Sequence, residues 1–513
     1  DQLFTWVLAL TAAALSVLMK QRGGMPLKHL GTAKHAYDFG VNCVAPVWRH
    51  ASTPKHAQLV ETWNAIVAAL RVDDLLTDAE ASALSCESEA VRQLSDGADL
   101  LDAVASEEAR RRLSHFAHSL RLEMPAPPPV DEMRSFSMLV PVYSETVLFS
   151  ADELAELDVE GVALLDDMKS TYAQEWANFC ERTKVDPATT GASLLAAATA
   201  HPHGTGDEAA HVEEVRLWAS LRGQTLARTV RGLSQYEDAL LLQARLEAPE
   251  ATEEARLALV RRKCQLVVAC QKYGDQKKAG DAKADDVETL LARFPCLRVA
   301  YLEVVKDRRA APNGAEEAAE VTTRYSSVLV RKSGGAVEEL SRVALPGNPI
   351  LGEGKPENQN LGMAFTTGEC VTMVDMNQDG YFEEALKMRN LLEEFRAADP
   401  SPGGERPVTI VGFPEHVFTQ SSGFVTAIYA AMQERFFGTW WQRVQVKLDI
   451  RAHYGHPDVL DKLHFMTRGG CSKASKEINL SEDVFAGYKT MLRGGRVVHV
   501  EYHQLGKGRM TNL

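Results

Sequence analysis

The chain has 513 residues, of which 45% are hydrophobic, and a formal net charge of -14. This length allows two or three folding units with a large buried core. The acidic balance excludes a protein that holds nucleic acid on a basic surface, because neutralising phosphates requires an excess of Lys and Arg. The eight cysteines form no CxxC pair and no disulfide-framework spacing, which indicates reduced thiols in the cytosol.

The N-terminal stretch from Leu3 to Met19 is apolar and is closed by Lys20 and Arg22. Residues 1–22 are predicted to be the end of a membrane helix, because cationic residues after a span are expected when the following chain is cytosolic. A buried core helix explains the same stretch equally well.

Residues 23–130 are predicted to form an α-helical unit. Between residues 60 and 122, apolar residues such as Trp63, Ile66 and Leu70 recur at helical spacing. The proline-rich run at residues 124–129 ends this pattern, because proline cannot continue a helix. A second unit, residues 131–513, is predicted to follow.

Short apolar runs alternate with helical stretches in this second unit. Each run is typical of a buried strand, and the alternation predicts an α/β domain with a mixed sheet and flanking helices. The predicted strands are Ser135–Val140, Leu266–Ala269, Leu297–Leu302, Thr372–Val374, Val408–Val411 and Val497–Tyr502.

Two of these runs are followed by candidate binding residues. Tyr143 and Glu145 come after the first strand, at the carboxyl end where open α/β sheets bind ligands. Asp375 and Asp379 come after a later strand, and two such carboxylates can hold a divalent cation against a diphosphate. A simple turn is an equally good interpretation of the first segment, and the opening of an EF-hand calcium loop is a rival interpretation of the second.

Two Gly-rich loops carry cations. Gly354 precedes Lys355, and Arg468 is followed by Lys473 and Lys476. Backbone N–H groups and cations together can receive phosphates, although such loops are more often solvated surface. HExxH, GxSxG and Walker A motifs are absent, which argues against a metalloprotease, an esterase and a P-loop ATPase.

Several long segments resemble the plant callose synthases and fungal glucan synthase subunits of glycosyltransferase family 48. The resemblance covers nearly the whole chain from about residue 60. It is carried by residues 135–150 (SFSMLVPVYSETVLFS), 216–232 (RLWASLRGQTLARTVRG), 345–360 (LPGNPILGEGKPENQN), 374–395 (VDMNQDGYFEEALKMRNLLEEF), 453–458 (HYGHPD) and 467–487 (TRGGCSKASKEINLSEDVFAG).

The resemblance implies a GT-A-like catalytic domain over residues 131–513 that makes β-1,3-glucan. Glucose would pass from UDP-glucose to the 3-hydroxyl of the growing chain, by inverting and processive transfer. Glu482 and Asp483 match the T-E-D helix start of family 2 synthases, so Asp483 is the expected catalytic base; helix-start electrostatics is the alternative for this pair. The expected UDP-glucose-binding residues are Tyr143, Glu145, Lys263, Gln271, Glu303, Lys355, Asp375, Asn377, Asp379, Arg468, Lys473 and Lys476.

The resemblance also implies partners and a location. It predicts an integral plasma-membrane protein with a cytosolic catalytic region, further membrane helices beyond this chain, a membrane-embedded synthase complex and a small GTPase regulator. Mg²⁺ is the expected cofactor, held by Asp375 and Asp379, and no organic cofactor is expected.

Four positions depart from the family pattern. Leu361 replaces His, Thr367 and Pro414 each replace Arg, and Glu303 replaces Asp. These departures make a non-catalytic scaffold paralogue in a glucan synthase complex the main alternative function. An EF-hand-like calcium-binding protein built around Asp375 is a further alternative.

Overall fold

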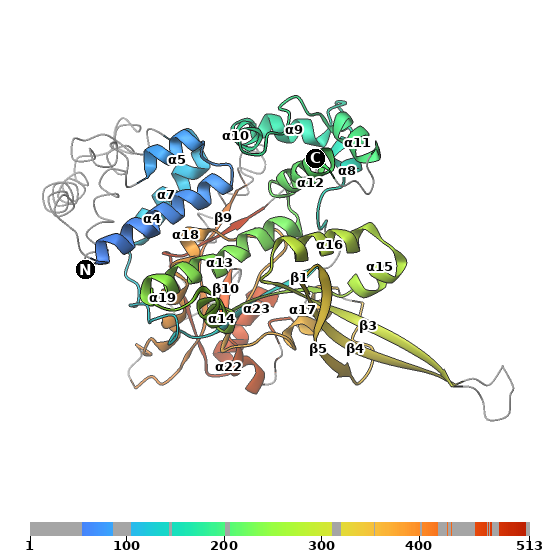
Figure 1. The fold of residues 1–513 in the computed structure, drawn as a ribbon. Coiled ribbons are helices and arrows are strands. Elements are labelled where there is room, and N and C mark those ends of the chain that lie inside the picture. The colour runs from blue at the N-terminus through green and yellow to red at the C-terminus, as the bar shows by residue number, and fades with distance from the viewer. Residues whose placement is uncertain are drawn as a thin grey trace, which may run out of the picture. The chain divides into compact units, whose positions relative to one another are not determined.

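The computed structural model describes residues 54–85, 104–142, 146–200, 206–309, 320–352, 354–400, 403–418, 428, 432, 457–468, 470, 472–474 and 482–508 (Figure 1). The predicted membrane helix at residues 1–22 lies outside these ranges. Within them, no helix is long and apolar enough to cross a membrane.

The chain divides into two compact units. The first comprises residues 1–124, 150–218 and 382–384, and the second comprises residues 125–149, 219–381 and 385–513. This division differs from the predicted boundary at residue 130, because the first unit also takes in two later segments of the chain.

Polar contacts explain why residues 150–218 belong to the first unit. Asn178 Nδ2 donates to the carbonyl of Asp74 at 2.8 Å, and Arg182 Nε lies 2.8 Å from Asp74 Oδ1. Asp74 itself is nearly buried and has a φ of 62°, so these contacts hold a left-handed turn in place. The helices of this unit are α4 (Pro54–Val72), α5 (Asp78–Leu84), α7 (Glu107–Ser119), α8 (Ala151–Ala155), α9 (Leu164–Thr171), α10 (Ala173–Thr183), α11 (Gly191–Ala200), α12 (Asp207–Ser220) and α18 (Phe382–Ala385).

The second unit is built on a nine-stranded mixed sheet with the order β11-β8-β10-β6-β1-β2-β3-β4-β5. The neighbours β6, β1, β2 and β3 are parallel, with Phe136 of β1 opposite both Cys264 of β2 and Cys370 of β6. The strands are β1 (Phe136–Val142), β2 (Cys264–Cys270), β3 (Leu297–Arg309), β4 (Glu320–Ser333), β5 (Ala336–Leu345), β6 (Cys370–Met373), β8 (Val408–Gly412), β10 (Asp458–Asp461) and β11 (Arg496–His499).

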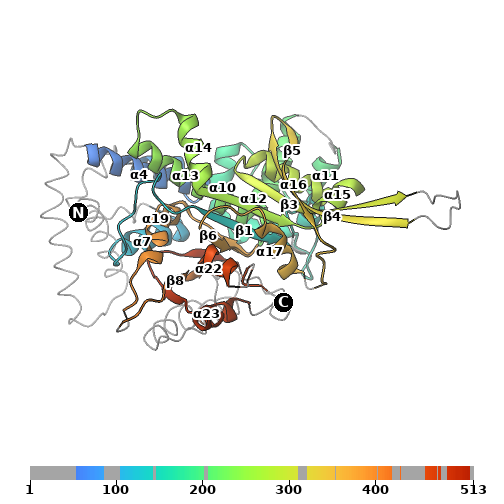
Figure 2. The same cartoon turned by 90° about the horizontal axis from the view of Figure 1, so that it is seen from below.

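Helices cover this sheet on both faces, as Figure 2 shows with α13 and α14 on one side and α22 and α23 on the other. Met363, Phe465 and Ala486, from α17, α22 and α23, join Leu139 and Val267 of the sheet in one buried core. The helices of this unit are α13 (Leu226–Glu247), α14 (Glu253–Lys263), α15 (Tyr273–Ala279), α16 (Ala282–Arg293), α17 (Lys355–Met363), α19 (Met388–Glu393), η6 (Glu394–Arg396), α22 (Lys462–Thr467) and α23 (Glu482–Leu492).

A smaller sheet has the order β7 (Gln378–Asp379), β12 (Leu505–Lys507) and β9 (Glu415–Val417). It brings a C-terminal strand beside the segment that follows β6. The α/β class with a large mixed sheet and flanking helices is thus confirmed, and a strand occurs at each of the six predicted runs.

Candidate active site

The carboxyl ends of β6, β1 and β2 meet at one edge of the large sheet, because these strands are parallel. Asp375 follows β6 at this edge, and Gln271 follows β2. α17 begins at the same edge, since Asn358 in its first turn donates from Nδ2 to the carbonyl of Val142, the last residue of β1. Lys355, the first residue of α17, is therefore placed beside the strand ends.

Asp375 lies between two ammonium groups. Its Oδ1 is 2.8 Å from Lys355 Nζ, and its Oδ2 is 3.1 Å from Lys507 Nζ. The amide of Asp375 donates to Gln378 Oε1 at 3.0 Å, which fixes the loop after β6. Lys507 comes from β12 and its side chain is almost buried, whereas a quarter of the Lys355 side chain is exposed.

Lys355 also pairs with Glu482, the first residue of α23. The Glu482 side chain is only 2% exposed, so Lys355 compensates a carboxylate that has lost its water. The helix dipole adds to this, because it favours negative charge in a first turn. Asp483 is the next residue of the same turn, and its side chain lies outside the described residues. We call Lys355, Asp375, Glu482 and Lys507 the charged cluster.

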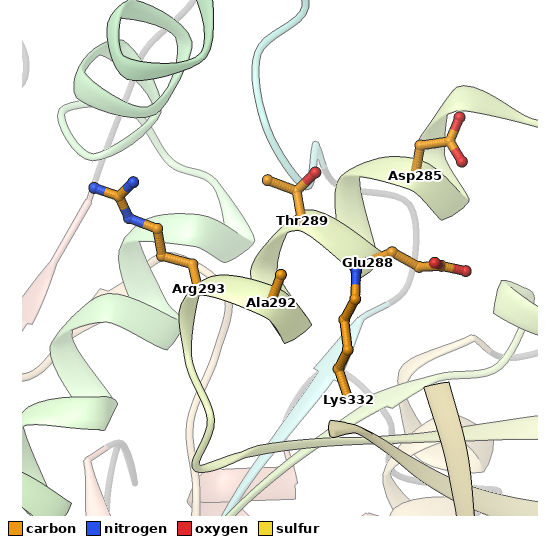
Figure 3. A pocket seen from close by; sticks show the side chains of 6 residues that line it. All are labelled: Asp285, Glu288, Thr289, Ala292, Arg293 and Lys332. Carbon is orange, nitrogen blue, oxygen red and sulfur yellow. The ribbon is translucent and has the colours of Figure 1, made fainter. Parts of the chain in front are cut away.

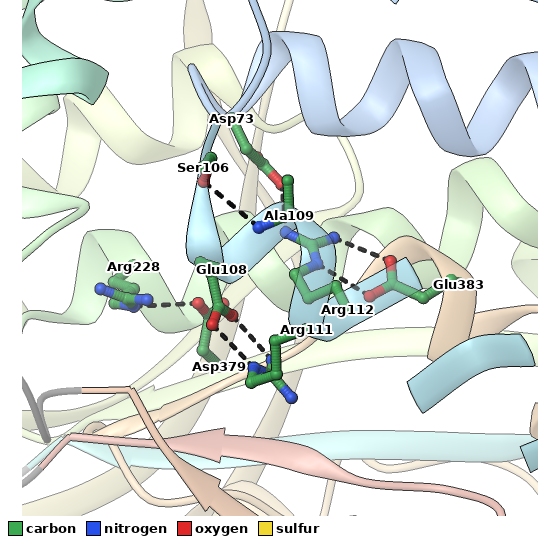
Figure 4. Close-up of polar contacts among 9 residues, drawn as sticks. All are labelled: Asp73, Ser106, Glu108, Ala109, Arg111, Arg112, Arg228, Asp379 and Glu383. Atoms are coloured by element: carbon green, nitrogen blue, oxygen red, sulfur yellow. Dashed lines mark hydrogen bonds and ion pairs between the residues drawn. The ribbon is translucent and has the colours of Figure 1, made fainter. Parts of the chain in front are cut away.

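Asp379 has a different partner. Arg228 of α13 donates from Nε to Asp379 Oδ2 at 2.9 Å (Figure 4), and its guanidinium lies over the ring of Phe418, 3.3 Å from the ring centroid. The Thr229 hydroxyl lies 2.8 Å from the carbonyl of Met376 and 2.7 Å from that of Gln378, so it can donate its one proton to either. The loop between β6 and β7 is therefore held along its length by α13.

The two carboxylates predicted to hold Mg²⁺ do not fit a divalent cation site in this arrangement. Both oxygens of Asp375 face ammonium groups, and Asp379 faces a guanidinium. Over the described ranges, His, Cys, Asp and Glu form no group of three or more that could hold a metal ion. We therefore assign no step of the reaction to a bound metal.

The EF-hand interpretation of residues 375–386 is not favoured. β6 precedes this segment and Gln378–Asp379 forms β7, whereas an EF-hand loop lies between two helices. Leu386 occupies the position of the bidentate Glu and is buried.

Lys473 forms a buried ion pair with Asp458. Its Nζ lies 2.8 Å from Asp458 Oδ1, and the two side chains are 0% and 3% exposed. Arg468, by contrast, is exposed and donates to Thr467 Oγ1 at 3.2 Å. Lys476 lies outside the described residues.

Four further predicted residues concern the same edge of the sheet. Tyr143 and Glu145 lie outside the described residues. Gln271 Nε2 and Asn377 Oδ1 are buried and have no hydrogen-bond partner within the described part of the chain. Such atoms cost free energy unless a ligand or water satisfies them, so both are suited to contact a bound molecule.

Lys263 and Glu303 make contacts with residues outside the charged cluster. Lys263 immediately precedes β2, at the opposite edge of the sheet from Asp375, and donates to the carbonyl of Met133 at 2.8 Å. Glu303 of β3 pairs with Arg342 of β5. Glu303 directly follows Leu302, whose amide donates to the carbonyl of Gln271, so it lies at the carboxyl edge of the sheet and stays a predicted binding residue.

The other three departures from the family pattern make contacts within the second unit. Leu361 is buried in α17. Thr367 bonds Ser137 Oγ through its backbone N–H and carbonyl, and the carbonyl of Pro414 accepts from the Leu505 amide. The scaffold interpretation is not favoured, since none of these three positions belongs to the charged cluster.

Sequence reasoning missed Lys507 and Arg228. Lys507 stands between Gly506 and Gly508, the same Gly-Lys combination that drew attention to Lys355. Arg228 lies inside the characteristic 216–232 segment, whose length hid the role of any single cation. Their partners become evident only when β12 and α13 are placed.

A separate open hollow lies against α16 and β4 (Figure 3). It has a volume of about 420 Å³ and is lined by Asp285, Glu288, Thr289, Ala292, Arg293 and Lys332. Burial opposes the ionisation of Glu288, yet its pKa lies below the usual value because Lys277 and Tyr273 donate to it. None of the predicted site residues lines this hollow.

Strand ends that gather charged side chains at one sheet edge are typical of ligand-binding α/β proteins. A family model for the 1,3-beta-glucan synthase component matches residues 103–512. The chain therefore belongs to the 1,3-beta-glucan synthase family, which confirms the resemblance seen in the sequence.

Its relatives include three callose synthases of Arabidopsis thaliana. The chain is 42% identical to callose synthase 9 over 88% of this chain and 24% of that protein. It is 43% identical to callose synthase 4 over 80% of this chain and 22% of that protein. It is 44% identical to callose synthase 10 over 79% of this chain and 21% of that protein. The chain thus spans less than a quarter of the length of these relatives.

We expect Gly232→Ala to displace the loop that carries Asp379. A Cβ at this position of α13 would lie 2.1 Å from Asp379 Oδ1 and 2.3 Å from the Gly380 nitrogen. Such overpacking typically costs about 1–3 kcal/mol of stability. Thermal unfolding measures it, with Gly347→Ala as control, because a Cβ there meets nothing within 4 Å. Equal melting temperatures for the two variants would contradict the close packing.

We expect Lys473→Met to lower the free energy of unfolding by about 3–5 kcal/mol, because Asp458 would stay buried without its counter-charge. Adding Asp458→Asn removes the second charge and should recover part of the loss. Chemical denaturation of both variants checks this. Wild-type stability of Lys473→Met, combined with weaker UDP binding, would instead support the predicted contact between Lys473 and the diphosphate.

Proposed function

We propose that this chain is the catalytic part of a β-1,3-glucan synthase. It transfers glucose from UDP-glucose to the 3-hydroxyl of a growing β-1,3-glucan, with inversion and processively. The observation that carries the proposal is the bridge of Lys355 between Asp375, at the strand ends, and Glu482, at the start of α23. Membership of the family supports the choice of substrates, and the charged edge of parallel strands supports a GT-A-like fold.

The donor binds at the charged cluster in this proposal. Lys355 is the more exposed cation and meets the diphosphate, while Lys507 holds Asp375 from the buried side. Tyr143 and Glu145, which follow β1, border the uracil. The orphaned polar atoms of Gln271 and Asn377 supply further hydrogen bonds.

The chemistry is a single displacement at the anomeric carbon. Asp483 takes the proton of the acceptor 3-hydroxyl. A lone pair of that oxygen then attacks the anomeric carbon of the α-linked donor. The bond from this carbon to the UDP oxygen breaks with its electron pair, and the β-linkage forms on the opposite face. Lys355 stabilises the negative charge that develops on the departing UDP.

We also propose that the protein acts in a membrane-embedded synthase complex at the plasma membrane, with its catalytic region in the cytosol. A small GTPase regulator stays a prediction. The Mg²⁺ requirement also stays a prediction, and glucan synthesis with and without a chelator checks it.

Asp483→Asn should lower the rate of glucan synthesis by roughly a hundredfold or more, which is the usual contribution of a general base. UDP-glucose binding should stay nearly unchanged, because the substitution keeps size and hydrogen bonding. Glu482→Gln is the comparison in the same turn: its amide oxygen still accepts from Lys355, so synthesis should fall much less than in Asp483→Asn. UDP-glucose-dependent glucan synthesis by the complete gene product in membranes measures both, and near-normal synthesis by Asp483→Asn would refute the assignment.

Lys355→Ala should raise the KM for UDP-glucose by roughly tenfold or more, because it removes a charge-assisted contact with the diphosphate. Lys278→Ala serves as control, since Lys278 is exposed on α15. An unchanged KM in a folded Lys355→Ala enzyme would show that the donor binds elsewhere.

A further inference from the structure

The segment that directly follows the loop at residues 375–381 is built into the first unit, which we call the helical unit. Asp375 to Tyr381 belong to the second unit, but Phe382 to Glu384 belong to the first. Glu383 and Glu384 are both fully buried. Two adjacent carboxylates without water require polar partners, and α7 provides Arg112 and His115.

Arg112 of α7 holds Glu383 with both arms of its guanidinium. Nε lies 2.7 Å from Oε1 and Nη2 lies 2.8 Å from Oε2, while Nη1 lies 2.8 Å from Asp73 Oδ2 (Figure 4). The Arg112 side chain is 3% exposed. A planar fork on a carboxylate fixes orientation as well as distance, so this pair allows Glu383 little freedom.

His115, three residues after Arg112 on α7, makes the second contact. Its Nδ1 lies 2.9 Å from Glu384 Oε1. Residues three apart share one face of a helix, so Arg112 and His115 together present one face of α7 to the two glutamates.

This anchor acts on a short stretch of chain. Glu383 is four residues after Asp379, whose carboxylate is held by Arg228. Arg228 thus holds Asp379 within the second unit, Arg112 holds Glu383 within the first unit, and Asp375 precedes both along the chain. Only a few residues separate Glu383 from the loop at Asp375. A displacement of the backbone at Glu383 is therefore expected to displace that loop as well.

We propose that Arg112 and His115 are positioning residues for the donor-binding loop, which they hold in register through Glu383 and Glu384. The inference rests on the proposed function, because it takes Asp375 to be part of the UDP-glucose site. Neither Arg112 nor His115 touches substrate in it. The helical unit thereby sets the geometry of a site to which it contributes no ligand-binding side chain.

The test compares variants of the complete gene product in membranes, with the KM for UDP-glucose as the readout. Glu383→Gln keeps the shape of the side chain and leaves Arg112 paired with Asp73, so the protein is expected to fold. Its KM should rise by roughly tenfold or more, because misplacement of a binding group by about 1 Å has effects of that order or larger. A merely structural role would reduce the amount of folded enzyme, and hence the maximal rate, without changing KM.

The controls come from the same helix. Arg111 and Glu108 form a partly exposed ion pair one position away (Figure 4), and Arg111→Gln and Glu108→Gln should leave the KM within twofold. If Glu383→Gln does not accumulate, the double variant Arg112→Gln, Glu383→Gln buries a neutral pair instead and should show the same rise in KM.

The outcomes separate this inference from the proposed function. A raised KM in Glu383→Gln and a normal KM in Arg111→Gln support the positioning role. A normal KM in Glu383→Gln overturns it, and if Lys355→Ala still raises KM, the proposed donor site stands. Normal KM values in both Glu383→Gln and Lys355→Ala overturn the two together.

Discussion

Lys355 pairs with two carboxylates of the candidate site, Asp375 and Glu482, which belong to different elements. Glu482, at the start of α23, is 127 positions away from Lys355 in the sequence, and Asp375 follows β6. Without the shared ammonium group, two nearby carboxylates would repel each other and would lose the charge that offsets their burial. One side chain therefore links the first turn of α17, the loop after β6 and the first turn of α23, in addition to the packing that holds each of them.

Strands that are buried on both faces could be predicted from the sequence. β1, β2 and β8 are continuous apolar runs because helices cover both sides of the sheet. β4 and β5 were not predicted, since β5 is largely exposed and reads as a mixture of apolar and charged residues. The short strands β7, β9 and β12 have two or three residues each and no pattern of their own; they exist through pairing with one another.

The candidate site was predictable in its carboxylates and less so in its cations. Asp375 was found because it follows a buried strand, and parallel strand ends gather at one edge. Which lysine faces which carboxylate is decided by tertiary placement. Lys507 lies 132 positions from Asp375, while Lys473, from a basic Gly-rich loop, is fully buried against Asp458. Charge and spacing in the sequence alone do not distinguish a cation that binds a ligand from a cation that neutralises a neighbouring carboxylate.

The interleaved division of the chain has a consequence for its synthesis on the ribosome. Domains generally fold as they emerge, N-terminal first. The helical unit cannot do so completely, because Glu383 leaves the ribosome long after Arg112 and after β1, β2, β3 and β6. Until then Arg112 lacks the carboxylate of Glu383, although Asp73 has already been made. The helical unit therefore completes its buried core late, only after the loop at Asp375 has been made.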